Sequence, residues 1–161
     1  MPTVRHATLA DLPVLAQALA HLPLMRRYGQ SPERLHAALS GAMGRGEGVL
    51  VYDDGGAPRG LAWYLPTGTF GLGGYLRLLA VAGDAHGGGI GRKLLEGYEA
   101  GVFTTSAHAF LLVSDFNQAA QRFYERHGYQ RVGAIPGLVL PDVAELIYWK
   151  PRPRAAGPVG W

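Results

Sequence analysis

Cysteine is absent from all 161 residues of the chain. Its absence excludes disulfide bonds, thiolate metal ligands and a cysteine nucleophile. The chain also lacks an apolar run long enough to cross a bilayer. The start, MPTVRHATLADLP, lacks the apolar centre of a secretory signal. We therefore expect a cytoplasmic protein that makes no contact with a membrane.

Charged residues are scarce, at 17% of the chain, and their distribution argues against a nucleic-acid partner. The final segment, 150–161, contains Lys150, Arg152 and Arg154 and no acidic residue. Without these three, the 12 remaining basic residues equal the 12 acidic ones, so the rest of the chain is close to neutral. Nucleic-acid modules usually carry a basic face on the domain itself. The six histidines show no spacing typical of metal ligands, and we predict no metal site.

Hydrophobic residues make up 48% of the chain, which is enough for a globular core at this length. No linker or internal repeat divides the sequence, so we predict a single domain over residues 1–150. The remaining segment, 151–161, is rich in proline and glycine, and we predict that it is a disordered tail.

Hydrophobic spacing and turn residues predict the elements of the first half of the chain. After a short strand at 3–7, Asp11 and Ser31 are expected to cap two helices, each with a proline in its first turn. Residues 48–65 have the pattern of two strands around a turn at Asp53–Gly56. A loop is expected over 66–74, beside an apolar strand that ends at Val81.

The second half alternates strands with helices, which predicts parallel strand pairs. The predicted elements are a helix at 90–102, a strand at 109–114, a helix at 120–127 and strands at 129–133 and 143–150. The complete order is β-α-α-β-β-β-α-β-α-β-β. This order predicts an α/β fold with a mixed central sheet and helices on both faces.

The segment HGGGIG, from His86 to Gly91, lies between the end of a strand and the start of a helix. A glycine-rich turn at such a place presents backbone N–H groups to an anion at the positive end of the helix dipole. Glycine lets a phosphate approach these amides, and Arg92 and Lys93 add positive charge. The P-loop pattern is absent because Leu94 follows Lys93, and the dinucleotide pattern GxGxxG also fails.

Two spaced motifs resemble those of the GNAT superfamily of N-acetyltransferases. The stretch LLAVAGDAHGGGIGRKLL is similar to the family's acetyl-CoA motif, a strand ending in Leu-x-Val followed by [Q/R]-x-x-G-x-[G/A] at a helix start. The stretch NQAAQRFYERHGYQRVG, residues 117–133, resembles the second motif, N-x-x-A-x-x-x-Y-x-x-x-G-[FY]. The resemblance covers roughly residues 2–150 and implies a GNAT-like fold with acetyl-CoA as co-substrate.

The resemblance also implies where acetyl-CoA would bind. Its pyrophosphate would lie on the loop amides, and its pantetheine arm would pair with the end of the strand. The cofactor-binding residues implied are Leu79, Ala80, Val81, His86, Gly87, Gly88, Gly89, Gly91, Arg92 and Asn117. Asn117 has the alternative role of capping its helix, and both roles are compatible. The family prefers Gln or Arg where this chain has His86, so we expect a modest loss of positive charge there.

Tyr124 matches the tyrosine that returns a proton to the CoA thiolate in this family, so the resemblance implies a catalytic general acid. The alternative for Tyr124 is a core aromatic beside Phe123. Many family members carry a glutamate base on the central strand, but GGYLRLLAV contains no carboxylate. Asp115, Glu145 or water remain as alternatives for the base.

The implied activity is acetyl transfer to an amine of a small molecule or a peptide. Without cysteine, the transfer is expected to be direct. The resemblance implies acceptor contacts from residues 21–34, 64–74 and 135–142, in a monomer or homodimer. The alternative is a catalytically silent acyl-CoA-binding or sensor module, which the missing glutamate favours.

Overall fold

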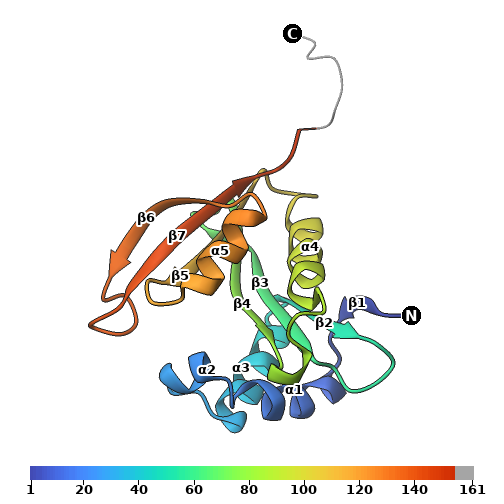
Figure 1. Cartoon of the computed structure of the whole chain (residues 1–161). Coiled ribbons are helices and arrows are strands. Elements are labelled where there is room, and N and C mark those ends of the chain that lie inside the picture. Colours follow the sequence, from blue (N-terminus) through green and yellow to red (C-terminus); the bar gives the residue numbers. More distant parts are fainter. Residues whose placement is uncertain (155–161) are drawn as a thin grey trace.

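The structure, a computed structural model, describes residues 1–154 of the chain. A seven-stranded mixed sheet runs through it in the order β1-β2-β3-β4-β5-β7-β6 (Figure 1). The strands are β1 (Thr3–His6), β2 (Gly48–Asp53), β3 (Gly60–Thr69), β4 (Gly73–Val81), β5 (His108–Ser114), β6 (Gln130–Pro136) and β7 (Ala144–Pro151). The helices are α1 (Leu12–Leu19), α2 (Pro23–Arg27), α3 (Pro32–Gly44), α4 (Ile90–Val102) and α5 (Gln118–Arg126), with 3-10 turns η1 (Leu9–Asp11) and η2 (Gly83–Ala85). The predicted α/β fold with a mixed sheet is confirmed.

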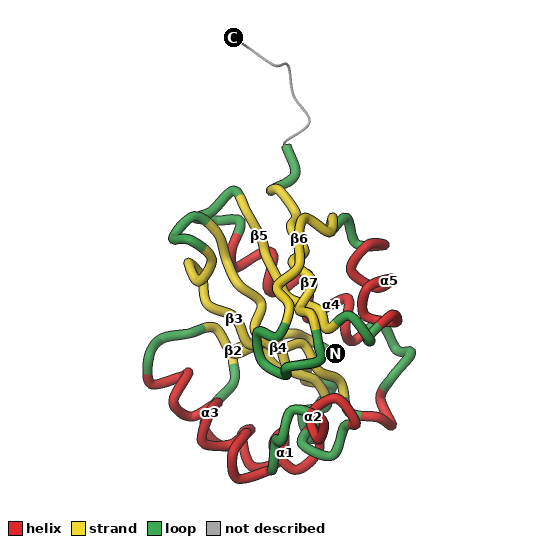
Figure 2. The backbone as a smooth tube through the Cα atoms, turned by 90° about the vertical axis from the view of Figure 1, so that its left-hand side faces the viewer, coloured by secondary structure: helices red, strands yellow, loops and turns green. Residues whose placement is uncertain are grey.

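The helices cover the two faces of the sheet unevenly (Figure 2). On one face, α4 and α5 share a core with β2–β5 and β7, in which Leu94 and Leu111 are fully or almost fully buried. On the other face, α1 and α3 share a second core with β2–β4, in which Leu39 and Leu61 are fully buried. Alternate residues of the central strands therefore enter two separate cores, which explains their nearly continuous apolar sequence.

β4 and β5 run side by side over a short distance only. Gly74–Leu76 pair in parallel with Ala109–Leu111, and the pairing ends there. β5 continues instead along β7 until Ser114 pairs with Glu145. The second half of β4 therefore has β3 on one edge and no strand on the other.

A β-bulge in β4 lies where the two strands separate. Trp63 and Tyr64 are consecutive in β3, but their partners in β4 are Leu78 and Leu76, so Arg77 is the extra residue. A bulge bends its strand and increases the local twist. The bend carries the end of β4 away from β5 and opens a cleft between them.

The N-terminal segment forms three helices where the sequence predicted two. α1 ends at Leu19, and Pro23 begins the additional helix α2, because proline cannot continue the preceding helix. Asp11 occupies the predicted N-cap position of α1, but its carboxylate makes no cap hydrogen bond there and accepts instead from Thr8 N at 2.7 Å. The predicted cap at Ser31 is confirmed by its side chain, which accepts from the backbone N–H three residues later.

The loop expected over 66–74 is mostly strand. β3 continues to Thr69, which pairs with Gly73 across a tight turn. Phe70 and Gly71 form this turn with φ values of +55° and +68°. The glycines in this segment suggested a loop, whereas they allow a hairpin in which the strands pack closely.

The predicted boundary at residue 150 falls inside β7, which continues to Pro151. Arg152 N donates to Ala107 O at 2.8 Å, and Arg152 Nη1 donates to Phe103 O at 3.1 Å. Residues 155–161 of the predicted tail lie outside the described residues. Within residues 1–154, no helix is long and apolar enough to cross a membrane.

Candidate active site

A cleft of about 860 Å³ lies at the point where β4 and β5 diverge. Its walls come from α2, the end of β4, the glycine-rich segment with the first turn of α4, and one side of α5. Three arginines line it, Arg27, Arg92 and Arg126, and no carboxylate does within the described chain. This charge pattern suits a ligand that combines anionic groups with an apolar or amide-bearing body.

The backbone of β4 offers polar groups to this cleft. Ala82 N donates to Arg59 O at 2.8 Å, so Ala82 pairs toward β3. In an antiparallel ladder, successive residues direct their N–H and C=O groups alternately to one edge of the strand and to the other. Ala80 therefore also bonds to β3. Leu79 and Val81 direct their N–H and C=O groups to the opposite edge of β4. That edge faces the cleft because β5 has separated from β4. An extended chain with amide groups can pair there like an added strand.

The glycine-rich segment carries two residues in the left-handed region. Gly87 has φ +89° and Gly89, the N-cap of α4, has φ +74°. A Cβ at Gly87 would meet nothing within 4 Å, and a Cβ at Gly89 would meet only Arg92 Nη2, at 3.9 Å. Packing inside the protein therefore does not require glycine at these two positions. The backbone conformation requires it, and the open space leaves the amides at the start of α4 accessible to a phosphate.

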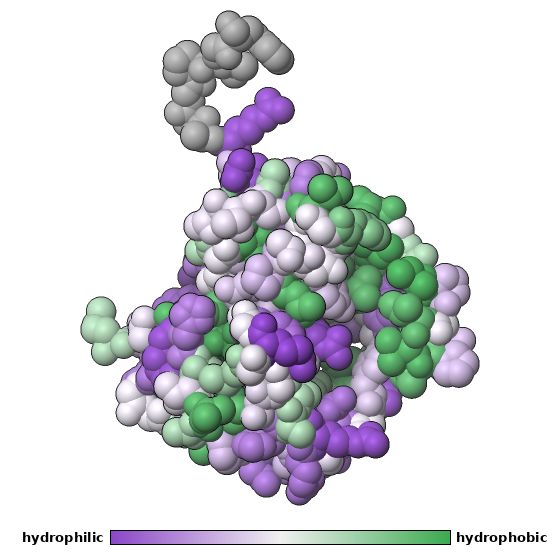
Figure 3. All heavy atoms as spheres, turned by 180° about the vertical axis from the view of Figure 1, so that it is seen from behind, coloured by the Kyte–Doolittle hydropathy of each residue, from purple (hydrophilic) through white to green (hydrophobic). Residues whose placement is uncertain are grey.

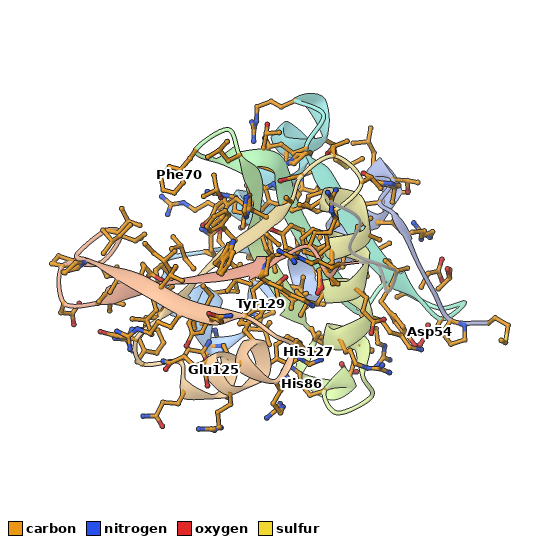
Figure 4. The ribbon with its side chains drawn as sticks, turned by 90° about the horizontal axis from the view of Figure 1, so that it is seen from above. Asp54, Phe70, His86, Glu125, His127 and Tyr129 are labelled. Carbon is orange, nitrogen blue, oxygen red and sulfur yellow. The ribbon has the colours of Figure 1, made fainter. Side chains whose placement is uncertain are left out.

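His86 is exposed, and its ring binds the end of β4. Its Nε2 lies 2.8 Å from Val81 O, on the edge of β4 that faces the cleft. The ring therefore joins the glycine-rich segment to β4. It also bonds to the carbonyl of Val81, which an extended ligand paired along this edge would otherwise use. Figure 4 shows His86 beside the first turn of α4.

Tyr124 reaches the cleft from α5 and is 8% exposed. Its ring packs edge-on against Phe123 and Tyr129, with centroids 5.1 Å and 5.8 Å away. Burial raises the pKa of the Tyr124 hydroxyl well above its usual value, so the group keeps its proton at neutral pH. None of the hydrogen bonds among residues 1–154 involves this hydroxyl, which leaves it available to a ligand.

Asn117 and Arg92 both line the cleft while making contacts of their own. Asn117 Oδ1 accepts from Ala120 N at 3.1 Å and so caps α5. Arg92 Nη1 lies 3.4 Å from Glu96 Oε1, an exposed pair one helical turn apart. Of the residues predicted to bind the cofactor or act in catalysis, the structure brings all except Gly88 to the cleft.

Neither candidate carboxylate lines the cleft. Asp115 Oδ2 accepts from Ala144 N at 3.1 Å and holds the start of β7. Glu145 is 5% exposed and accepts hydrogen bonds from Tyr28 and Ser114. Within residues 1–154, no group of three His, Cys, Asp or Glu residues could hold a metal ion.

The segment 21–34, expected from the resemblance to contact the acceptor, contributes the α2 wall of the cleft. Leu22–Met25 and Arg27 line it, and Arg27 stacks on Phe116 with its guanidinium carbon 3.6 Å from the ring centroid. The proline at position 23 marked the start of this helix, but no local signal placed it against β4 and α5.

Residues 16–129 match the acetyltransferase (GNAT) family, and the chain belongs to this family. A GNAT-family acetyltransferase from Bacillus cereus has the same fold, with a TM-score of 0.79, 18% identity and coverage of 96% of this chain and 99% of that one. The ribosomal-protein-alanine N-acetyltransferase from Brucella melitensis gives a TM-score of 0.71 and 24% identity, covering 92% and 98% of the two chains. The protein yncA from Salmonella typhimurium, solved with acetyl-CoA, gives a TM-score of 0.71 and 18% identity, covering 98% of each chain. No curated protein sequence matches the chain.

Family membership makes this protein an acyltransferase, with acetyl-CoA as the co-substrate that fits the family. The geometry agrees with that ligand. The cleft offers accessible amides at the start of α4 and outward-facing amides on β4, and these two groups suit the phosphates and the amides of acetyl-CoA.

Proposed function

We propose that the protein transfers an acetyl group from acetyl-CoA directly to an amine of a small molecule or a peptide. The observation that carries this proposal is the position of Leu79 and Val81, whose N–H and C=O groups face the cleft between the diverging strands. The chain contains no cysteine that could hold the acetyl group in between.

In the proposed complex, the protein binds the pyrophosphate through backbone N–H groups of Gly87–Gly91 and through Arg92. Leu79, Ala80 and Val81 align the pantetheine arm along β4, with Asn117 facing it from α5. His86 holds the glycine-rich segment against β4 through Val81 O. The binding site is therefore mostly backbone, which tolerates His86 where the family prefers Gln or Arg.

In the proposed reaction, the acceptor nitrogen attacks the thioester carbonyl. A cleft-facing N–H of Leu79 or Val81 donates to the carbonyl oxygen as negative charge develops on it. Tyr124, which burial keeps protonated, donates its proton to the departing sulfur. The acceptor loses its own proton to water, or to Asp115 or Glu145 from outside the cleft lining.

A catalytically silent acyl-CoA-binding module is the second candidate, because no carboxylate lines the cleft within the described residues. Family membership favours the enzyme. Thiol release from acetyl-CoA across a panel of primary amines and amino-terminal peptides distinguishes the two. Turnover above the uncatalysed rate with at least one amine supports the enzyme, and acetyl-CoA binding without turnover of any amine supports the silent module. The cytoplasmic location and a monomeric or homodimeric state stay predictions.

A further inference from the structure

Within residues 1–154, one part of the sheet has no helix over it on one of its two faces. α1 and α3 lie over β2–β4, and the same side of β5, β6 and β7 carries no helix (Figures 1 and 2). Tyr75 pairs with Phe110, Phe110 with Trp149, and Leu112 with Ile147, so these five side chains share this side of the sheet. They are half-buried, whereas their neighbours in sequence on the opposite side are buried under α4 and α5. We call these five residues the open face.

The open face is extended by an unbroken series of rings. Phe70 packs edge-on against Phe110, with centroids 6.2 Å apart. His108 lies 6.2 Å from Phe110 and 6.1 Å from Trp149, and Trp149 Nε1 donates to His108 Nδ1 at 3.0 Å. Figure 3 shows hydrophobic side chains gathered on the rear of the molecule, on the side formed by β5–β7. Exposed aromatic and aliphatic side chains that gather on one surface are typical of a binding site.

Phe70 is held on this surface at an energetic cost. It is 83% exposed, and it is the one residue other than glycine in the described chain with positive φ. A bulky residue in this conformation is disfavoured by about 1 kcal/mol or more. A strained turn that keeps an aromatic ring in solvent, at the outer edge of the molecule (Figure 4), indicates a role for that ring in binding.

A buried carboxylate, Glu145, lies at the other end of the open face, and it forms no ion pair with any residue of the described range 1–154. Glu145 pairs with Ser114 in the sheet, which places it on the same side as Leu112 and Ile147. Asp11, the other buried carboxylate in the described chain, forms an ion pair with Arg5 at 2.8 Å, whereas the partners of Glu145 are hydroxyl groups. A buried charge is stable when an opposite charge accompanies it.

We propose that the acetyl acceptor is a primary amine with an apolar body, which binds with its ammonium group at Glu145 and its body along Leu112, Ile147 and Phe110. The inference rests on the proposed function and names its substrate class. The ammonium group would give the Glu145 carboxylate a positively charged partner. The apolar body of the amine would be buried against the open face. Charge complementarity therefore favours an amine over a second copy of the chain as the occupant.

The Glu145 end of the open face adjoins the cleft, since Ser114 pairs with Glu145, and Phe116, two residues after Ser114, lines the cleft. α2 forms one wall of the cleft, and Tyr28, the residue after α2, donates to Glu145. Phe110 and Ser114 are four residues apart in β5, about 13 Å at the usual rise of a strand. An amine bound at Glu145 thus has its nitrogen beside the cleft and its body directed toward Phe70.

The test measures kcat/KM for linear primary amines from propylamine to octylamine, with ω-hydroxyamines of equal length as polar controls. We expect kcat/KM to rise by about two- to fourfold for each added methylene, because each one leaves water for the open face. The hydroxyamines should fall below the alkylamines at each length. A flat series, with the polar amines accepted equally, overturns the inference while leaving the proposed function intact.

Two variants locate the effect. Phe110→Ala should flatten the dependence on chain length without changing acetyl-CoA affinity. Phe70→Ala removes an exposed ring with little risk to folding and should lower kcat/KM for the longest amines only. Leu9→Ala, which truncates a side chain that is 66% exposed in η1, is the matched control and should change neither. An unchanged dependence in both open-face variants overturns the inference.

Glu145→Gln should raise KM for every amine by about three- to fivefold and leave kcat within about twofold, since it removes charge but keeps the shape. A loss confined to kcat would contradict the anchoring role.

Light scattering at the assay concentration tests whether a second copy of the chain occupies the open face. If the protein is a dimer that Phe70→Ala dissociates, and the acceptor preference does not change, the open face is assigned to a second copy. Absence of thiol release from every amine would contradict the proposed function and this inference together.

Discussion

Tyr124 and Tyr129 belong to one motif but occupy different environments. Their rings touch edge-on at 5.8 Å, yet Tyr124 lines the cleft while Tyr129 is 2% exposed and lies in the interior. The hydroxyl of Tyr129 is buried without a hydrogen-bond partner in the described chain. Burial raises the pKa of both hydroxyls, so both stay neutral. Two substitutions to phenylalanine should therefore have opposite consequences.

Tyr124→Phe should reduce kcat by about 10²-fold with little change in KM for acetyl-CoA, because it keeps the ring and deletes the proton donor. General acids contribute about 10²–10⁴-fold, and a thiolate is a fairly good leaving group, which favours the lower end. Single-turnover kinetics check this with chemistry isolated from product release. A kcat within about twofold of the original would make Tyr124 a core aromatic.

Tyr129→Phe should stabilise the protein by about 1 kcal/mol, because it removes a buried donor that has no partner. For a domain of this size that corresponds to a rise in Tm of about 2–4 °C. Calorimetry measures it, with activity as the control that should not change. A lower Tm would indicate that the hydroxyl is hydrogen-bonded in solution, for instance to a water.

At the scale of elements, the start of α4 is the part of the site most sensitive to a side chain. Gly89→Glu places a bulky anion where the phosphates would lie, and acetyl-CoA affinity should fall more than tenfold, or about 1.4 kcal/mol. Gly55→Glu is the matched control, since Gly55 also has positive φ and open space but lies in the β2–β3 connection. Calorimetric titration of both folded variants checks this, and equal affinities would contradict the phosphate site.

The turn η1 is fastened to β1 by a charge pair that should make stability depend on pH. Arg5 donates to both carboxylate oxygens of Asp11, at 2.8 and 3.0 Å, and this lowers the Asp11 pKa to about 2. A lowered pKa means that the contribution is complete above the unfolded value near 4 and is lost as the pH falls toward 2.

Asp11→Asn should therefore lower the free energy of unfolding by about 1–2 kcal/mol at pH 7, allowing for the partial exposure of Arg5. The difference from the original protein should shrink between about pH 4 and pH 2. Urea unfolding across this range measures it. A difference that stays constant down to pH 2 would show that the ion pair is not its source.

At the scale of the whole molecule, two features of the sheet produce the site. The divergence of β4 from β5 exposes backbone amides that a complete sheet would use internally. The uneven helix cover leaves the side of β5–β7 beside that divergence uncovered. Two substrates could thus approach one point from different sides, which is what direct transfer requires.

Among the residues that the structure describes, no carboxylate lines the cleft, and the pH dependence of the reaction should reflect this. Without a dedicated base, the rising limb of kcat/KM against pH should follow the acceptor and shift between two amines of different pKa. Asp115→Asn and Glu145→Gln should each reduce kcat/KM by less than about tenfold, below the usual contribution of a general base. The contrary result is a rising limb at the same pH for both amines. If one of these variants removes that limb and lowers kcat/KM by about 10²-fold or more, its residue is the base.

The sequence by itself determined the features that depend on neighbours in the chain. The helical start at Ser31, the positive-φ glycines before α4 and the Asn117 cap are local, because a turn or helix end is stabilised by groups a few residues away. The two motifs were also local, and they sufficed for the family, the order of strands and helices in the second half and the residues expected at the cleft.

The tertiary structure alone decided which of these groups meet. Arg77 is one residue among nine in β4, and only pairing with β3 makes it a bulge. The hairpin at Phe70 was hidden because its strands are rich in glycine. Tyr28 and Glu145 are 117 residues apart, and no periodicity in either segment indicates their contact. Contacts of this separation depend on how strands pair and helices pack, and those energies arise only when the sheet has formed.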